Sequence, residues 1–356
     1  MHPGHVLRRT CYWKLRFVTA IAIWIAVIFA GHSSLARTKV RFLQVSPPAD
    51  IEGIEVEDGQ FVIRQASGLR HIVTGPPGSP EFVSHDRAMQ MQPPADGLPD
   101  GEVTISADGK MQAWLTGPSR RYDHGVLGDD LEATGVRLRT DAGHELNYQL
   151  PADFVFEDRR VRFWDIDGDG RQELVAIKSG FDGGARISAF TVVDDQISPR
   201  AESKPIGRAY RWLNLISAAD FDGDGKIEIA AVITPHLGVV LKLFRLAEDQ
   251  LEPVYEAHGF SNHGIGMRSM QLATSADVNG DGIVDLIVPN ESRTAIRIVT
   301  FANGHFRELH RITLKAGISG NMVLLENGRE NGEGGRVQVI FPMTNGKLGI
   351  ILIEKT

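Results

Sequence analysis

One cysteine, Cys11, occurs in the 356 residues of this chain. A disulfide framework is therefore excluded, and stability has to come from packing or from bound metal ions. The chain also lacks a Gly-x-Ser-x-Gly elbow, a His-Glu-x-x-His motif and a phosphate-binding loop, so no common catalytic signature is present. Its 38 Lys and Arg are outnumbered by 45 Asp and Glu. This balance excludes a basic footprint for nucleic acid.

The N-terminal residues have the pattern of a targeting segment. Residues 17–30 form an apolar run, and a small-x-small cleavage pattern follows at 34–36. Four basic residues precede the run: Arg8, Arg9, Lys14 and Arg16. The run is shorter than the roughly 20 residues that a spanning helix needs. We therefore predict a signal peptide at 1–36 and a secreted or periplasmic mature chain with no stable membrane span; an uncleaved anchor is the alternative.

Three loops share one pattern of oxygen-bearing side chains, at 165–173, 220–228 and 277–285. Their starts are 55 and 57 residues apart. Oxygen ligands occupy loop positions 1, 3, 5 and 9: Asp165, Asp167, Asp169 and Glu173; Asp220, Asp222, Asp224 and Glu228; Asp277, Asn279, Asp281 and Asp285. Calcium binds six to eight oxygens, and the backbone carbonyl at position 7 (Arg171, Lys226 and Ile283) adds one more. The pattern predicts about three Ca²⁺ sites.

An EF-hand and a metal-free turn are the two other interpretations of these loops. An EF-hand needs a Glu at position 12 and a helix on each side, but position 12 is Ala176, Ala231 and Val288. Apolar, strand-like residues flank each loop instead. Each loop is therefore predicted to be the turn of a β-hairpin. A hairpin turn rich in Asp and Gly but without metal is the simpler alternative.

Weaker copies of the loop begin at 54, 104 and 329, so six units start 50 to 61 residues apart. No long segment outside the N-terminus has helical periodicity. Short alternating strands at this period predict an all-β fold, a β-propeller of about six four-stranded blades, with seven as the alternative. We expect degenerate blades at 37–150, three calcium-loop blades at 151–315 and a closing blade at 316–356. The strand at 40–45 is predicted to pair with this closing blade.

The motif Asp-x-Asp-x-Asp-Gly-x-x-Asp between two strands resembles the FG-GAP/VCBS repeat family, which includes the integrin alpha-subunit propeller and many bacterial secreted proteins. Glu173 and Glu228 replace the ninth Asp, and Asn279 replaces the third. The resemblance implies that these residues bind calcium on one rim of the propeller. Because Asn279 supplies no charge, we expect the third loop to bind calcium most weakly.

Five residues outside the loops are candidates for ligand binding. Arg211 and Arg268 each lie nine residues before a loop start, so they occupy equivalent positions. If their strand lines the central channel, the two guanidinium groups suit a carboxylate or phosphate ligand; pairing with nearby acidic residues is the alternative. Tyr122, His124 and His263 suit acid–base chemistry if they converge, and are otherwise turn residues.

These observations favour a secreted or periplasmic calcium-binding propeller that acts as a protein- or glycan-binding or scaffolding module. No set of catalytic residues is evident. The alternative is a hydrolase or lyase of the cell envelope that uses the propeller as its scaffold. A third hypothesis is a subunit of an envelope assembly that docks a partner on one propeller face.

Overall fold

The computed structural model describes residues 38–355 except 49, 66, 77–78, 85–93 and 328–334. All of these residues belong to one compact unit, Ala36–Thr356. The predicted signal peptide at 1–36 lies outside the described residues and stays a prediction. A search of the described chain for a helix long and apolar enough to cross a bilayer finds none.

Strands account for nearly all of the regular structure. The described residues contain 25 strands and two single-turn 3-10 helices, η1 (Gly125–Leu127) and η2 (Ala302–Gly304), but no α-helix. One four-stranded sheet contains β2 (Ile51–Glu57), β3 (Gln60–Gln65), β4 (Arg70–Thr74) and β5 (Glu81–Ser84). The next contains β6 (Thr104–Ile105), β7 (Met111–Thr116), β8 (Gly135–Thr140) and β9 (Glu145–Gln149).

A nine-stranded sheet follows and divides into two antiparallel groups. The first group contains β10 (Phe154–Phe156), β11 (Arg162–Trp164), β12 (Glu173–Gly180), β13 (Arg186–Val193) and β14 (Gln196–Ser203). The second contains β15 (Leu213–Ala219), β16 (Glu228–Ile233), β17 (Val240–Ala247) and β18 (Gln250–His258). The two groups are joined only where β14 and β18 pair in parallel over two residue pairs.

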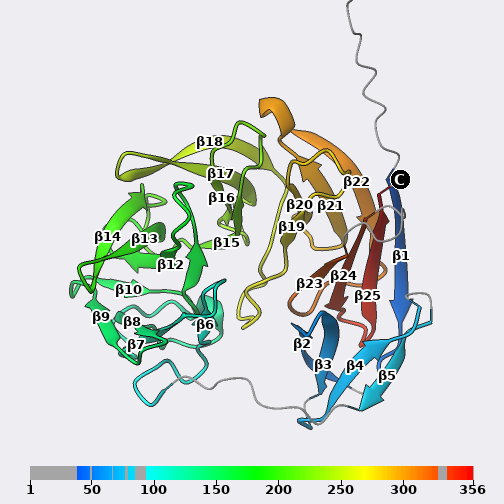
Figure 1. Ribbon diagram of the computed structural model, residues 1–356, viewed down its shortest axis with the longest axis horizontal. Coiled ribbons are helices and arrows are strands. Elements are labelled where there is room, and N and C mark those ends of the chain that lie inside the picture. Colours follow the sequence, from blue (N-terminus) through cyan, green and yellow to red (C-terminus); the bar gives the residue numbers. More distant parts are fainter. Residues whose placement is uncertain are drawn as a thin grey trace, which may run out of the picture. The chain divides into compact units, whose positions relative to one another are not determined.

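The last two sheets again have four strands. One contains β19 (Thr274–Ala276), β20 (Asp285–Pro289), β21 (Ala295–Thr300) and β22 (Arg307–Thr313). The other contains β23 (Val323–Asn327), β24 (Arg336–Pro342), β25 (Leu348–Glu354) and β1 (Lys39–Val45). The strand groups follow one another around a common centre (Figure 1). The chain therefore folds as an all-β protein of the β-propeller class.

Burial is greatest in the middle strands of a group. Every residue of β12 is buried, as expected for a strand covered on both faces. The outer strand β18 is instead mostly exposed, with only Leu251 and Ala257 buried. This difference explains why middle strands such as β16 and β20 are nearly continuous apolar runs in the sequence, while the outer strands carry charged residues.

The first and last strands belong to the same sheet. β1 pairs antiparallel with β25 from Lys39↔Glu354 to Val45↔Leu348, so the predicted pairing of this strand with the closing blade is confirmed. Side chains of β1 alternate between two cores. Phe42 stacks on Phe341 at 6.3 Å between ring centroids, whereas Leu43 packs with the next cluster. One short strand therefore helps to hold two neighbouring groups together.

Five hydrophobic clusters fill the spaces between neighbouring groups. One of them, for example, combines Val175 of β12 with Ile229 of β16. The others join β6–β9 to β10–β14, β15–β18 to β19–β22, β19–β22 to the β23–β25 sheet, and that sheet to β2–β5. Within the described residues, no such cluster joins β2–β5 to β6–β9. The predicted ring is thus packed tightly at five of its junctions.

We expect Phe42→Ala to lower the free energy of unfolding by about 2 kcal/mol, because it removes a partly buried ring that packs on Phe341. Arg41→Ala on the same strand is the control. It breaks only the exposed ion pair with Glu354, which is worth about 0–1 kcal/mol. Urea unfolding measures both variants, and equal effects would contradict a packing role for β1.

Candidate metal centres and two cavities

In the first group of the nine-stranded sheet, β10 and β11 pair with β12 over different residues and together take the place of one first strand. The three acidic loops connect this first-strand position to the second strand in three successive groups: β11 to β12, β15 to β16, and β19 to β20. They are hairpin turns without flanking helices, which excludes the EF-hand interpretation. The glycines at positions 4 and 6 have φ between 77° and 86° in all three loops. Such positive φ values cost little for glycine and are unfavourable for other residues. The repeated glycines at positions 4 and 6 therefore permit the backbone turn around which the Asp residues are spaced.

One hydrogen-bond network is repeated in each loop. The Asp at position 1 accepts the backbone N–H groups of positions 4 and 6 at 2.7–3.2 Å. The side chain at position 3 accepts the N–H of position 5, and that at position 5 accepts the N–H of position 7. The carboxylate at position 9 accepts the N–H of position 2 at 3.0–3.1 Å. The network turns the side-chain oxygens of each loop inward.

The carboxylate at position 9 is buried in every loop: Glu173 is 3%, Glu228 0% and Asp285 0% exposed. Burial raises the pKa of Glu173 and Glu228, and it raises the pKa of Asp285 to about 7. Asp285 Oδ1 has no hydrogen-bond partner among the described residues. A buried carboxylate with an unpartnered oxygen, surrounded by other carboxylates, fits a site for a divalent cation.

Two of the loops bring three carboxylates together. Asp165, Asp167 and Glu173 each place one oxygen within 4.8 Å of the others. Asp220, Asp222 and Glu228 do the same in the second loop. In the third loop Asn279 stands at position 3 and donates to Asp281 at 2.9 Å. These clusters and the carbonyls at position 7 are the groups that would hold the predicted ions.

The second loop contains a cation of its own, Arg245 on β17. Its guanidinium donates to Glu228 and, at 2.9 Å, to Asp222, and it lies 3.0 Å from Asp224. Arg245 pairs with Glu228 in the sheet register. By the same register the residues opposite Glu173 and Asp285 are threonines, Thr191 and Thr300. Arg200 and Lys355 reach carboxylates at positions 3 and 1 of the first and third loops, but only Arg245 among these three cations pairs with a buried ninth carboxylate.

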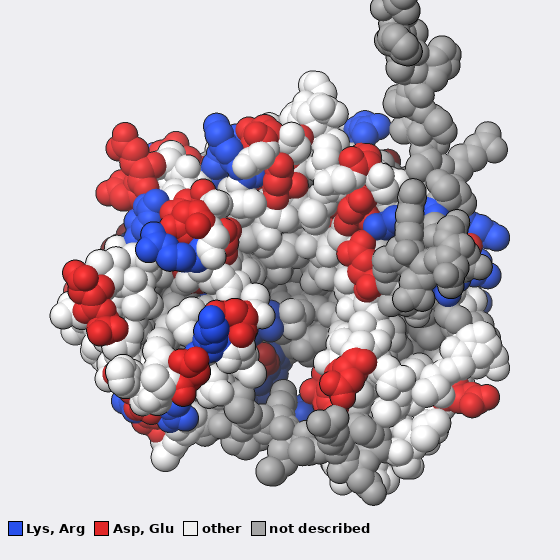
Figure 2. All heavy atoms as spheres, viewed as in Figure 1, with Lys and Arg blue, Asp and Glu red and all other residues white. Residues whose placement is uncertain are grey.

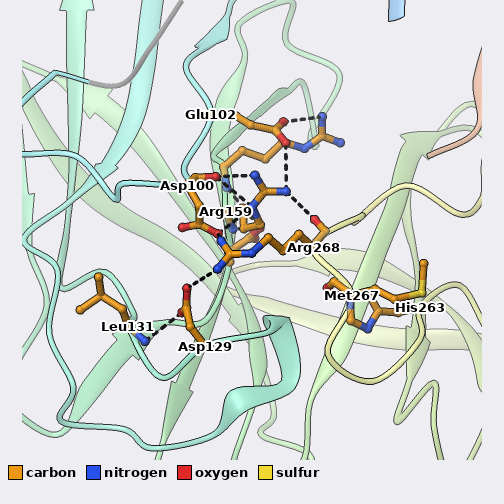
Figure 3. A network of polar contacts seen from close by, with 10 residues as sticks. Asp100, Glu102, Asp129, Leu131, Arg159, His263, Met267 and Arg268 are labelled. Atoms are coloured by element: carbon orange, nitrogen blue, oxygen red, sulfur yellow. Dashed lines mark hydrogen bonds and ion pairs between the residues drawn. The ribbon is translucent and has the colours of Figure 1, made fainter. Parts of the chain in front are cut away.

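A cavity of about 930 Å³ lies among the first strands of several groups and is lined by residues of β2, β6, β19 and β23. Figure 2 shows one face of the molecule hollowed near its centre, with acidic and basic side chains around the hollow. Arg268 lines this cavity, but it lies on the β18–β19 connection, whereas the sequence had predicted a strand there. Its guanidinium is paired with Asp100 at 2.5 Å and with Asp129 at 2.9 Å (Figure 3).

Arg159 strengthens the same network. Its Nε lies 3.1 Å from Asp100, and its guanidinium donates to the backbone carbonyl of Arg268 (Figure 3). The β18–β19 connection is thereby tied to connections of two other strand groups. Arg268 is thus paired with acidic residues of the protein itself, which was the alternative to ligand binding in the sequence analysis.

Arg211 lines a different cavity, of about 290 Å³, together with His124. The predicted pair Arg211 and Arg268 is therefore not brought together. Tyr122 is buried, and its hydroxyl accepts the N–H of Tyr210 at 2.8 Å. His263 is fully buried, with Nε2 2.9 Å from the carbonyl of Met267. Of the three candidate acid–base residues, only His124 lines either of the two cavities.

Sequence reasoning missed several residues around these sites. Arg245, Glu157, His236 and Trp212 carry no motif, and each is placed by strand pairing or by a connection from another group. The register of the β16–β17 hairpin is the one signal that could have identified Arg245, because it lies opposite Glu228.

Residues 165–231 match the FG-GAP-like repeat family, so the chain contains a repeat of this kind. The match spans the first two acidic loops. No curated protein matches the chain by sequence.

Two solved structures that resemble the chain are WD40 domains. The domain of coronin from Toxoplasma gondii has a TM-score of 0.38 and 10% identity, over 90% of this chain and 87% of that one. The domain of SCAP from fission yeast has a TM-score of 0.36 and 11% identity, over 86% of this chain and 67% of that one. The assignment of the chain to the β-propeller class depends on the strand topology described above and not on these two similarities.

We expect Arg245→Gln to lower stability in the absence of calcium by about 3 kcal/mol, because it leaves the buried Glu228 without its charge partner. The same substitution should strengthen calcium binding at the second loop, because a competing cation is removed. Thermal melts with and without calcium, together with calorimetric titration, measure both effects. Lys242→Gln, which breaks an exposed pair on the same strand, is the control. If Arg245→Gln lost the same stability with and without calcium, the result would contradict competition between Arg245 and calcium for the second loop.

His263 provides a test of pH dependence. Burial lowers the pKa of His263 to about 3, below the roughly 6.5 of an unfolded chain, so the native state holds it neutral. As pH falls from 6.5 toward 3 only the unfolded state takes up this proton, and stability is lost at up to about 1.4 kcal/mol per pH unit. The stability of the wild type relative to His263→Asn should therefore fall by about 2 kcal/mol between pH 7 and 4.5. A constant difference in urea unfolding would contradict this assignment.

Proposed function

We propose that the protein is an exported, calcium-stabilised β-propeller that acts as a binding or scaffolding module for a protein or glycan partner. The observation that carries the proposal is the threefold repetition of one loop geometry with a buried carboxylate at its ninth position. A single acidic turn is common at protein surfaces without any ion. Three such turns with the same hydrogen bonds, at the same place in successive strand groups, support one shared role.

Calcium would be held by the side-chain oxygens of positions 1, 3, 5 and 9 and by the carbonyl of position 7. When bound, it supplies positive charge to clusters in which carboxylates outnumber the cations that pair with them. The protein contributes the turn, whose glycines and backbone N–H groups orient the oxygens before any ion arrives. Each loop then joins the first two strands of its group more firmly.

Export is proposed from the N-terminal pattern of basic residues, apolar run and cleavage site. Because the chain has a single cysteine, bound calcium would add to hydrophobic packing the stability that disulfides give many exported proteins. The scaffolding role is proposed from the repeat itself and from the lack of an assembled catalytic set. Tyr122 and His263 are engaged by the backbone and buried. No observation therefore favours the hydrolase or lyase alternative over a binding role.

The test is a thermal melt of the purified protein after chelation and after calcium is restored. A ligand that binds only the folded state stabilises it by about 2.7 kcal/mol at a hundredfold excess over its Kd. With three sites we expect a fall of the melting temperature by several degrees in EDTA and full recovery in millimolar calcium but not in magnesium. A melting temperature that does not change in EDTA would contradict the proposal that calcium stabilises the protein.

The matched variants are Asp165→Asn and Asp277→Asn in the first and third loops. Each removes one charge at position 1 while its amide oxygen still accepts a backbone N–H. We expect each to reduce the bound calcium by about one equivalent at limiting concentration. Asp194→Asn, which alters an exposed turn outside the acidic loops, should leave the calcium stoichiometry unchanged.

A further inference from the structure

The 290 Å³ cavity lies at the opposite ends of the strands from the acidic loops. It is formed by the β7–β8, β14–β15 and β16–β17 connections, which carry His124, Tyr210 to Trp212, and His236 with Leu237. Successive antiparallel strands send their connections to alternate ends, and the acidic loops use the other end. The cavity is therefore a separate site, and its role does not depend on calcium binding.

Two nitrogen-bearing side chains that line the cavity, His124 and Arg211, are candidates to bind an anion. His124 Nδ1 lies 2.5 Å from a carboxylate oxygen of Glu157, which is fully buried and also accepts a hydrogen bond from Ser179 at 2.5 Å. Glu157 therefore fixes the imidazole ring, and Nε2 is the ring nitrogen left for a ligand, since no described residue hydrogen-bonds it.

Arg211 provides the second polar group. Its one hydrogen bond within the described chain is a weak contact of 3.3 Å to the carbonyl of its neighbour Tyr210, and no described carboxylate forms an ion pair with it. Arg268, at the equivalent position of the next strand group, is held by two carboxylates. Arg268 is therefore held by ion pairs within the protein, whereas the guanidinium of the equivalent Arg211 is available to a ligand in the cavity.

The charges near the cavity favour an anion. Arg293 donates to Ser261 and to the carbonyl of His263, and its charge contributes, after burial, to the low pKa of His236. Burial raises the pKa of Glu132, whose charge neighbour is Glu157, to about 10, so Glu132 stays uncharged at neutral pH. No exposed carboxylate is among the residues that line the cavity.

Apolar side chains form the rest of the cavity and its rim. Tyr210 and Trp212 line it, and Leu237 and Ile265 line it while 67% and 74% exposed. Phe181 is also exposed and packs 5.9 Å from the Tyr210 ring. Exposed apolar groups gathered around a concave site with a few polar groups are typical of ligand binding.

We propose that this cavity binds a small ligand, or a chain end, in which a carboxylate stands beside an aromatic group. Arg211 would receive the carboxylate through charge-assisted hydrogen bonds, and His124 would donate to it from Nε2 when that nitrogen carries a proton. Tyr210, Trp212 and Leu237 would cover the aromatic group. A cavity of about 290 Å³ has room for one such group. The source is either a free aromatic acid or the C-terminal residue of a peptide, which share this chemistry.

The experiment titrates the full chain by calorimetry with two pairs of probes. One pair is indole-3-acetate and its neutral amide; the other is acetyl-Gly-Gly-Trp with a free C-terminus and with an amidated one. We expect each free carboxylate to bind at least about tenfold more tightly than its amide, the loss expected when a charge-assisted hydrogen bond is removed. Tighter binding of the free acid identifies a small molecule as the source, and tighter binding of the peptide identifies a chain end.

Arg211→Met should weaken the binding of both carboxylates by at least about tenfold and leave the binding of the amides unchanged. The control is Arg208→Met, an exposed arginine on the same connection that does not line the cavity. Thermal melts establish that both variants fold. The proposal is overturned if neither carboxylate binds at millimolar concentration, or if carboxylate and amide bind equally. The comparison of acid with amide uses the wild type, so it holds even if Arg211→Met fails to fold.

Discussion

The carboxylate at the ninth position of each acidic loop is the group on which the loop geometry depends. It belongs to the buried start of a second strand, yet it reaches back to the backbone N–H of position 2. Strand and turn are therefore locked to each other. This arrangement places a carboxylate where water solvates it poorly and where other carboxylates repel it, so its pKa is raised and a compensating positive charge stabilises the ionised form. In the second loop Arg245 supplies part of that charge from the neighbouring strand. For all three loops we propose that calcium supplies the rest.

The antiparallel order of strands places the acidic loops and the small cavity at opposite ends of the strands. Connections between first and second strands carry the acidic loops, and connections at the other ends carry the small cavity. Arg211 and Arg268 occupy equivalent positions in two strand groups but differ in their contacts: one lines the small cavity without a carboxylate partner, and the other ties the β18–β19 connection to Asp100 and Asp129 (Figure 3).

Hydrophobic packing between the strand groups is uneven. Five junctions have a buried cluster, whereas the described residues of β2–β5 and β6–β9 share none. Residues of both groups instead line the 930 Å³ cavity. The pairing of β1 with β25 matters more in such a ring, because it makes one sheet from the two ends of the described chain.

Local features were predictable from the sequence because their causes are local. The spacing of Asp and Gly requires a tight turn, alternating apolar residues require strands, and a repeat near 55 residues requires similar units in succession. The all-β propeller, the hairpin nature of the acidic loops and the pairing of the 40–45 strand all follow from such patterns. The partners of individual charges do not. Arg245 reaches the second loop from the next strand, Arg268 finds carboxylates far from it in sequence, and Glu157 fixes His124 from another strand group. The sequence by itself determined which residues form turns and strands, since backbone geometry depends on neighbouring residues. Only the tertiary structure decided which charges are compensated and which remain available, since burial and pairing are set by segments that folding brings together.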